Sequence, residues 1–367
     1  MRKNFFGMSK SENRVKSKKE KGKILNSLKI SLSVIGAVVG AGFITGREIL
    51  TFFSGYNPIA VSAALFICFF LLITFILEIK NEKIDSVLKK GNFAVYFLNF
   101  FIIASMLGAT DSLFFSVFKL PKSIPLGSLM LICAATAVCC GGIRKIEKAN
   151  VFIVPFMLIV AAYIALGKIL SRNFFVSPLS LCGTFGFSGV YGCLSYCSMN
   201  VGLAQPFFCK IKSENKNFSP AVTALASAFC LSAFVLIYLL ALKNSIGESA
   251  DIPILCLVCS PIAKYLAAAS IFGGIITTQF SAEYPMISAL KKRKKGGLCI
   301  ALLALFAFVF SRLGFYVIVD VIYPAMGFIA LVYYAAIIVF AALPFFRSAR
   351  RRHTSARQAR LKARSRS

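Results

Sequence analysis

The sequence predicts an all-α integral membrane protein of about ten transmembrane helices, arranged as two blocks of five with opposite orientation. Three observations lead to this prediction. Hydrophobic residues make up 58% of the 367-residue chain, whereas soluble domains contain roughly 45–50% apolar residues. Apolar segments of at least about 20 residues, the length that crosses a bilayer as a helix, recur along the chain. Glycines interrupt the first and the sixth of these segments.

Hydropathy divides the chain into ten spans joined by polar or glycine- and proline-containing connections. The predicted spans cover residues 25–53, 59–79, 93–117, 124–142, 150–170, 183–208, 220–242, 261–290, 297–314 and 321–346. Together they form one domain over residues 24–346, with a first block at 24–170 and a second at 183–346. Residues 1–23 and 347–367 are basic tails that are poor in core-forming residues and are predicted to be disordered.

The net charge of +29 follows the predicted topology. Lys and Arg concentrate in both tails and in alternate connections, at residues 80–90, 144–148, 210–216 and 291–295. The positive-inside rule therefore places both termini on the cytoplasmic side of a bacterial cell membrane, which requires an even number of spans. We expect the tails to contact anionic lipid rather than nucleic acid.

Span one contains Gly36, Gly40 and Gly42 in the middle of an apolar run that is longer than a straight helix needs. Glycine destabilises a helix interior by about 1 kcal/mol relative to alanine. Backbone that leaves helical pairing at membrane depth persists only where it lines a cavity or binds something. Broken helices near the midplane are typical of secondary transporters, so the sequence predicts a broken first helix beside a solute site.

Span six occupies the matching position in the second block and is also rich in glycine. It contains Gly183, Gly186, Gly189, Gly192 and Gly202. Its polar centre comprises Ser195, Tyr196, Ser198 and Asn200. A second glycine-interrupted segment in this position predicts an inverted repeat, since an odd number of spans per block reverses the orientation of the second block. We therefore expect helix six to be broken as well.

Residues 34–53, which contain these first-span glycines and end in Gly-Arg-Glu-Ile-Leu-Thr-Phe-Phe, resemble the amino-terminal signature of the YkvI-like bacterial membrane proteins. That family is grouped with amino-acid permeases of the amino acid/polyamine/organocation superfamily. Shorter similar segments follow in chain order at residues 150–158, 195–205, 273–278 and 323–328. The resemblance implies a LeuT-type fold, in which a bundle of spans one, two, six and seven rocks against a scaffold of spans three, four, eight and nine.

The resemblance also implies a sodium site between the first and eighth helices. The matching groups are the carbonyls of Gly36, Val39 and Gly274 and the adjacent hydroxyls of Thr277 and Thr278. Oxygen-only ligation suits a hard cation such as Na⁺, the expected coupling ion, and no other cofactor is expected. Two alternatives remain open. The glycines can serve close helix packing while a threonine bonds to its own helix, or protons can drive transport, although span five lacks a central lysine.

The solute is expected beside the breaks, where helix amino-terminal N–H groups face a carboxylate and carbonyl ends face an ammonium group. The candidate residues are Ala41, Gly42, Phe43, Tyr196, Ser198, Asn200 and Gly202. Asp111 on span three is a further candidate because burying a charge in a membrane is costly. Its alternative is a position near the outer mouth beside Lys119 or Lys122. Arg47 and Glu48 are placed in the outer half of span one, where they gate a vestibule or pair with neighbours.

The sequence thus predicts a secondary active transporter of a small amino-acid-like solute that is coupled to sodium and works by alternating access. The alternative is a non-transporting amino-acid sensor on the same fold, similar to a germinant-receptor subunit, which would require partner subunits. No enzyme is expected, because the chain shows no His/Glu metal motif and no nucleophile paired with a base. Glu283, near the inner end of span eight, is interpreted as an interfacial charge.

Overall fold

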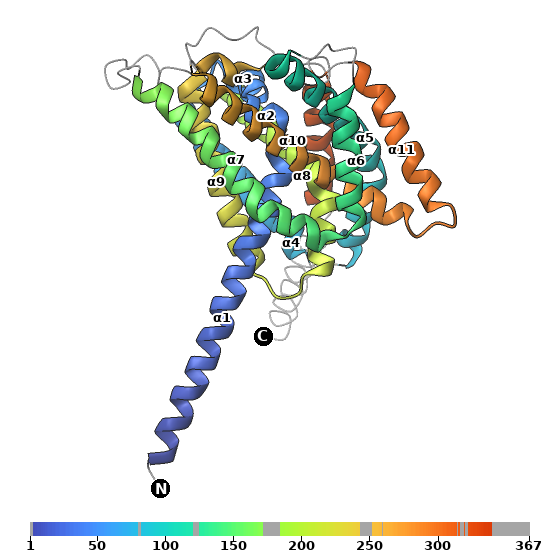
Figure 1. Cartoon of the computed structure of the whole chain (residues 1–367). Helices are drawn as coiled ribbons and strands as arrows, with labels where there is room; N and C mark the ends of the chain where they lie inside the picture. The colour runs from blue at the N-terminus through green and yellow to red at the C-terminus, as the bar shows by residue number, and fades with distance from the viewer. Residues whose placement is uncertain are drawn as a thin grey trace, which may run out of the picture.

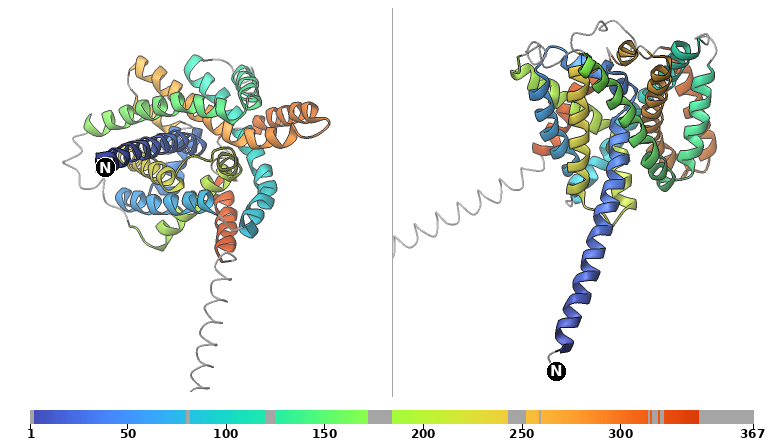
Figure 2. Two further views of the ribbon diagram at one scale, coloured as in Figure 1. Left: turned by 90° about the horizontal axis from the view of Figure 1, so that it is seen from below. Right: turned by 60° about the vertical axis from the view of Figure 1, so that its left-hand side comes forward.

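The computed structural model describes residues 3–79, 82–119, 125–171, 184–242, 252–258, 260–313, 315, 319 and 322–339. In these residues the secondary structure is helical, apart from one isolated bridge between Tyr56 and Thr184. The helices lie side by side in a single bundle, and the amino-terminal part of the first helix projects away from it (Figures 1 and 2).

Each predicted span has a helical counterpart. Span one is divided among α1 (Lys3–Val38), α2 (Ala41–Thr45) and α3 (Arg47–Phe53). The other spans correspond to α4 (Pro58–Glu78), α5 (Glu82–Phe118), α6 (Leu126–Cys140), α7 (Ile143–Ser171), α8 (Phe187–Glu214), α9 (Pro220–Leu242), α10 (Pro261–Leu290), α11 (Gly296–Phe310) and the helix Tyr323–Val339. Two short 3-10 helices, η3 (Pro253–Leu257) and η4 (Ser311–Leu313), complete the described elements.

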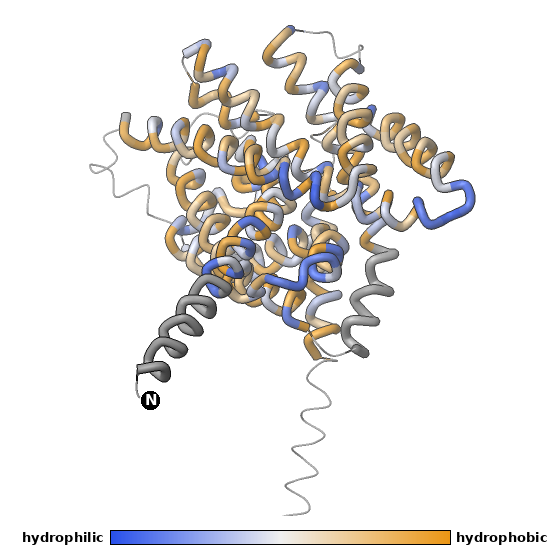
Figure 3. Tube along the Cα trace, turned by 60° about the horizontal axis from the view of Figure 1, so that its bottom comes forward, coloured by the Kyte–Doolittle hydropathy of each residue, from blue (hydrophilic) through white to orange (hydrophobic). Residues whose placement is uncertain are grey.

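Hydropathy separates these helices into two groups. Within the described residues, six helices are long and apolar enough to cross a membrane, in α4, α5, α7, α9, α10 and α11 with η4, while α6 and Tyr323–Val339 are shorter apolar helices. Hydrophobic residues cover most of the helices (Figure 3), and large side chains such as Phe152 and Phe187 remain exposed on the outside. The two remaining spans, the divided first span and α8, carry glycines and polar residues at their centres.

The packing of the helices places span one against α10. The α4 helix packs against α8 and α9, whereas α10 packs against α5, α6 and α7. The α1 helix contacts α9 and α7 and also reaches α10. These two sets of neighbours agree with the bundle and the scaffold that the family resemblance implies. The junction between them is where α1 ends and α2 begins.

The amino-terminal tail differs from the expectation. Residues 3–23, predicted to be disordered, continue as the first part of α1 and extend beyond the bundle (Figure 2). The segment contains no proline and is rich in Lys and Glu, whose straight side chains keep most of their rotamer freedom in a helix. The carboxyl-terminal tail, residues 347–367, lies outside the described residues.

Candidate functional site

The predicted break in span one is present. The α1 helix ends at Val38, Val39 and Gly40 are not helical, and α2 begins at Ala41. The Gly40 N–H donates a 3.0 Å hydrogen bond to the carbonyl of Val38, so it does not reach the carbonyl of Gly36, which would accept it in a continuous helix. The break therefore releases main-chain oxygen atoms inside the bundle, as a cation site requires.

The α10 helix packs directly on this break. A Cβ added to Gly274 would lie 3.4 Å from the Val39 carbonyl oxygen, and one added to Gly36 would lie 3.1 Å from the Cβ of Thr277. At Gly40 an added Cβ would lie 2.9 Å from the hydroxyl oxygen of Thr278. The structure therefore brings all five predicted sodium ligands to one place, and the glycines allow the two backbones to approach this closely.

The two threonines of this cluster differ in their hydrogen bonds. The Thr277 hydroxyl donates to the carbonyl of Gly274 at 3.1 Å, which is the bond to its own helix that the packing alternative predicts. The Thr278 hydroxyl oxygen is buried and has no hydrogen-bond partner among the described residues. Unpaired buried polar atoms are rare because they cost free energy. These oxygen atoms fit a hard monovalent cation such as Na⁺, with Thr278 as the side-chain ligand most clearly available.

A small cavity adjoins the break. It is lined by Ala37, Val38, Gly40, Glu48, Asn99, Ile102, Asn200, Leu203, Thr278, Ser281, Ala282 and Tyr323. The volume open to the centre of a water molecule is about 20 Å³. The cavity therefore holds about one water-sized group. Of the described residues that line it, one is acidic and none is basic. This small cavity with polar and apolar lining residues is the candidate solute site.

Glu48 lines this cavity from the first turn of α3, the part of span one that follows the break. Gly46, whose φ is +83°, turns the chain between α2 and α3. The side chain of Glu48 therefore lies against Gly42, in the space that a Cβ at Gly42 would need. Glu48 is 3% exposed and accepts a 3.3 Å hydrogen bond from the hydroxyl of Tyr196.

Asn99 on α5 is a cavity residue that the sequence analysis missed. It is fully buried, and neither its amide nitrogen nor its amide oxygen has a hydrogen-bond partner among the described residues. Tyr323 was likewise noted only as part of a matching segment, and it lines the same cavity. A single Asn inside an apolar span is a signal of function in membrane proteins, because burial of its amide is costly.

The predicted solute-binding residues separate into two groups. Asn200 lines the cavity, and its amide nitrogen donates to the Tyr196 carbonyl at 3.0 Å. Tyr196 is linked to the cavity by its hydrogen bond to Glu48. In contrast, Phe43 is buried near Tyr238, with ring centroids 6.3 Å apart, and Ser198 is buried without being part of the described lining. Ala41 and Gly42 remain at the break itself.

The break predicted in helix six is not observed: α8 is continuous over its full length. Its glycines make room for neighbouring rings. Added Cβ atoms at Gly189 and Gly192 would lie 3.4 and 3.9 Å from the ring of Tyr56, and one at Gly202 would lie 3.5 Å from the ring of Tyr334. The packing offsets the low helix propensity of these residues. Gly202 lines a separate apolar hollow and not the cavity.

Asp111 is also placed away from the cavity. One of its carboxylate oxygens accepts a 2.9 Å hydrogen bond from the Ser128 N–H in the first turn of α6, and the other forms a 3.2 Å ion pair with Arg312. The predicted neighbour was Lys119 or Lys122, of which Lys122 lies outside the described residues, and the observed partner comes from η4. Asp111 thus caps one helix and links it to another, and it is not among the described residues that line the candidate solute site.

Glu283 is a second buried carboxylate and not an interfacial charge. It is 2% exposed and accepts hydrogen bonds from the hydroxyl of Thr136 on α6 and from the amide of Gln279, the latter at 3.0 Å. The bond from Thr136 joins α6 to α10, whereas the bond from Gln279 lies within α10. Glu283 is absent from the described lining of the cavity.

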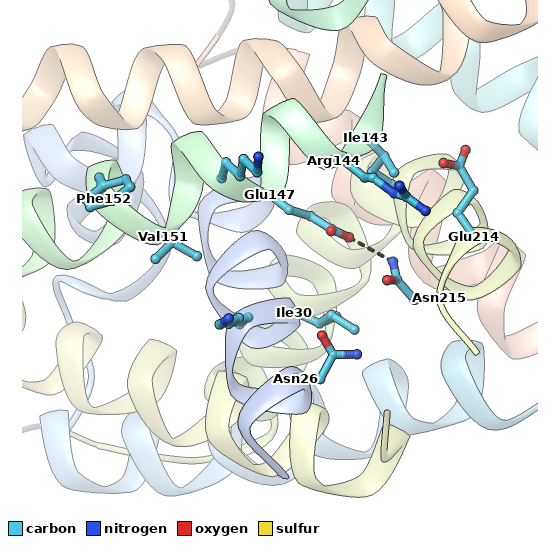
Figure 4. A pocket seen from close by; sticks show the side chains of 11 residues that line it. Asn26, Ile30, Ile143, Arg144, Glu147, Val151, Phe152, Glu214 and Asn215 are labelled. Carbon is cyan, nitrogen blue, oxygen red and sulfur yellow. Dashed lines mark hydrogen bonds between the residues drawn. The ribbon is translucent and has the colours of Figure 1, made fainter. Parts of the chain in front are cut away.

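A larger hollow of about 530 Å³ lies further along α1 (Figure 4). Its lining includes Asn26 and Ile30 of α1, Glu147 of α7 and Asn215, whose amide donates to Glu147 at 2.8 Å. Ile30 precedes Ala37 of the small cavity by seven residues, which corresponds to about 10 Å along a helix. The intervening turns of α1 are buried. The larger hollow is thus a separate space on the side of the amino terminus.

Comparison with solved structures defines the fold class. MhsT in complex with L-phenylalanine matches with a TM-score of 0.60 over 83% of this chain and 87% of that chain, at 13% sequence identity. A manganese transporter of Eremococcus coleocola matches with a TM-score of 0.48, over 86% of this chain and 78% of that chain, at 15% identity. The match to MhsT, together with the apolar helices described above, shows that the protein is an all-helical membrane protein with a LeuT-type fold.

Comparison of sequences gives a closer relationship. No family model matches the chain. The membrane protein YkvI of Bacillus subtilis (strain 168), which is described as uncharacterized, is 25% identical over 332 residues, covering 83% of this chain and 93% of YkvI. The chain is a homologue of YkvI and a multi-pass membrane protein, which confirms the resemblance seen in residues 34–53.

Proposed function

We propose that this protein is a secondary active transporter that moves a small amino-acid-like solute together with sodium, by alternating access. The observation that carries the proposal is the broken first span packed on α10, where the buried Thr278 hydroxyl has no partner among the described residues. Main-chain oxygens and a threonine hydroxyl at membrane depth suit Na⁺. A buried hydroxyl without a hydrogen-bond partner is unfavourable for folding, so its presence here supports a role in binding.

The two separate hollows support alternating access. The small cavity lies beside the break in span one, and the larger hollow lies along the same α1 helix towards the amino-terminal side. The buried α1 turns between them form a barrier about 10 Å thick. Movement of α1 away from α7 would open the cavity to the larger hollow, which we assign as the inner vestibule. With both termini in the cytoplasm, this vestibule faces the cell interior.

The test is the thermal stability of the detergent-purified full-length protein across a panel of amino acids and related amines, in sodium and in potassium at equal ionic strength. A ligand that binds only the folded state raises the unfolding midpoint by mass action. We expect one class of solute to stabilise the protein more in sodium than in potassium. Stabilisation that is equal in the two salts contradicts sodium coupling. Binding without any flux in proteoliposomes favours the amino-acid sensor.

A further inference from the structure

Glu48 is a feature of the cavity that lies outside the predicted set of sodium ligands. A carboxylate that is 3% exposed and has no positively charged residue beside it in the described lining is unfavourable unless a cation or a proton compensates it. Its one described hydrogen-bond donor is the hydroxyl of Tyr196. The carboxyl group of Glu48 is therefore readily ionised only when a cation lies beside it, either the sodium ion proposed at Thr278 or a positive group of the solute.

Glu48 also occupies the position that the carboxylate of a bound amino acid would otherwise approach. Its side chain lies against Gly42 at the beginning of α2, beside the main-chain N–H groups that follow the break. A second carboxylate in this space would lie beside the carboxyl group of Glu48 and would repel it when both are ionised. The cavity thus disfavours a zwitterionic solute and favours a solute that brings only a positive group.

Asn99 supplies independent evidence for a ligand at this place. Its amide is fully buried, lines the same cavity and has no partner among the described residues. An amide oxygen accepts hydrogen bonds from an ammonium group, as does the carboxylate of Glu48. The amide of Asn200 and the hydroxyl of Tyr323 complete the polar lining.

An apolar hollow of about 80 Å³ begins next to this polar cavity. Leu203 lines both spaces, and the consecutive residues Leu98 and Asn99 line the apolar and the polar space respectively. The apolar hollow is otherwise formed by side chains such as Met199 and Met326. The two spaces together match a molecule with a compact positive head and an apolar substituent.

We propose that the solute is a primary amine without a carboxylate, which places its ammonium group against Glu48 and Asn99 and its apolar substituent towards the hollow beside Leu203. This inference rests on the proposed function, because it takes the small cavity as the solute site. Glu48 determines specificity by charge, and Tyr196 positions it. The protonated amine and the carboxylate form a buried ion pair, so neither charge is left unpaired.

The experiment compares amines with the amino acids that share their side chains. Binding of 2-phenylethylamine and L-phenylalanine, and of 3-methylbutylamine and L-leucine, is measured on the full-length protein in detergent. We expect each amine to bind at least 10-fold more tightly than its amino acid. In the Glu48→Gln variant, which keeps the shape and removes the charge, we expect amine affinity to fall at least 10-fold and the preference to disappear.

Two variants control this comparison. Glu283→Gln removes the charge of an equally buried glutamate outside the cavity and should leave the preference unchanged. Glu48→Asp keeps the negative charge, and it should remain selective for amines if Glu48→Gln does not fold.

The outcomes separate the two proposals. An amino acid that binds as tightly as its amine in the wild-type protein overturns the inference about Glu48 and leaves a transporter of amino acids in place. A preference for amines that persists in a folded Glu48→Gln variant overturns the role of Glu48. If neither class of ligand binds in sodium or in potassium, both the amine inference and the proposed function fail.

Discussion

Replacement of Thr278 by valine tests the sodium site with little change in shape. Both side chains are β-branched and prefer the same region of rotamer space in a helix. Since the Thr278 hydroxyl has no hydrogen-bond partner among the described residues, the substitution breaks no described bond. We therefore expect the free energy of unfolding in sodium-free buffer to stay the same or to rise.

The expected loss appears in sodium binding. A hydrogen-bonding or ligand interaction with a charged group contributes about 1.5–3 kcal/mol. At about 1.4 kcal/mol for each factor of ten, removal of the Thr278 oxygen weakens Na⁺ binding by roughly 10- to 150-fold. In the wild-type protein, sodium at 100 times its Kd stabilises the folded state by about 2.7 kcal/mol through mass action. At the same concentration the variant loses roughly half of this stabilisation if binding weakens 10-fold, and roughly nine-tenths of it if binding weakens 150-fold.

The assay is a titration of the unfolding midpoint with NaCl, with KCl added to keep the ionic strength constant. Thr278→Ser retains the hydroxyl and should respond to sodium, whereas replacing both Thr277 and Thr278 by alanine should abolish the response. A Thr278→Val variant that binds sodium with wild-type affinity would refute this site. It would leave close helix packing at Gly40 as the explanation of the cluster.

Three further predictions follow from the described contacts. Gly46→Ala should lower the free energy of unfolding by about 1 kcal/mol because of the left-handed backbone, and by a further 1–3 kcal/mol because the added methyl group overpacks against Leu242. Gly167→Ala is the control, since the added methyl group meets open space, and it should be neutral or stabilising. Chemical denaturation measures the free energy of unfolding of both variants. Asp111→Asn should lower the free energy of unfolding by less than about 1 kcal/mol, because the side chain of its partner Arg312 is 40% exposed. The substitution should leave solute affinity unchanged, and a reduced affinity would place Asp111 in the solute site. Protease sites engineered at the two termini should both be cut from the cytoplasmic side of the membrane, and cleavage from opposite sides would require an odd number of spans.

Much of the fold follows from simple physical signals in the sequence. The long apolar helices are visible because a helix that crosses a bilayer must be apolar for about 20 residues, and six helices of the described residues meet this requirement. The break in span one is visible because Gly36, Gly40 and Gly42 combine low helix propensity with a position at membrane depth. The same signal fails in α8, where glycines such as Gly189 and Gly202 serve packing against aromatic rings. Glycine content does not by itself distinguish these two uses.

The site is only partly readable from the sequence, for a geometric reason. The carbonyls and threonines of the proposed sodium site lie on two neighbouring segments at regular spacing, so a sequence pattern is sufficient to propose them. Glu48 depends on the left-handed turn at Gly46, which reverses the direction of its side chain relative to a straight helix. Asp111 depends on Arg312, which is 201 residues away in the chain. Such long-range pairings have no local signature.

The most direct test of the account is solute flux into proteoliposomes that contain the purified full-length protein, with an inward sodium gradient and no membrane potential. The solute is the ligand that gives the largest sodium-dependent stabilisation. We predict accumulation above the external concentration, collapse of this accumulation when sodium is equal on both sides, and its loss in Thr278→Val. Equilibration that ignores the sodium gradient, or binding with no flux at all, would contradict a sodium-coupled transporter.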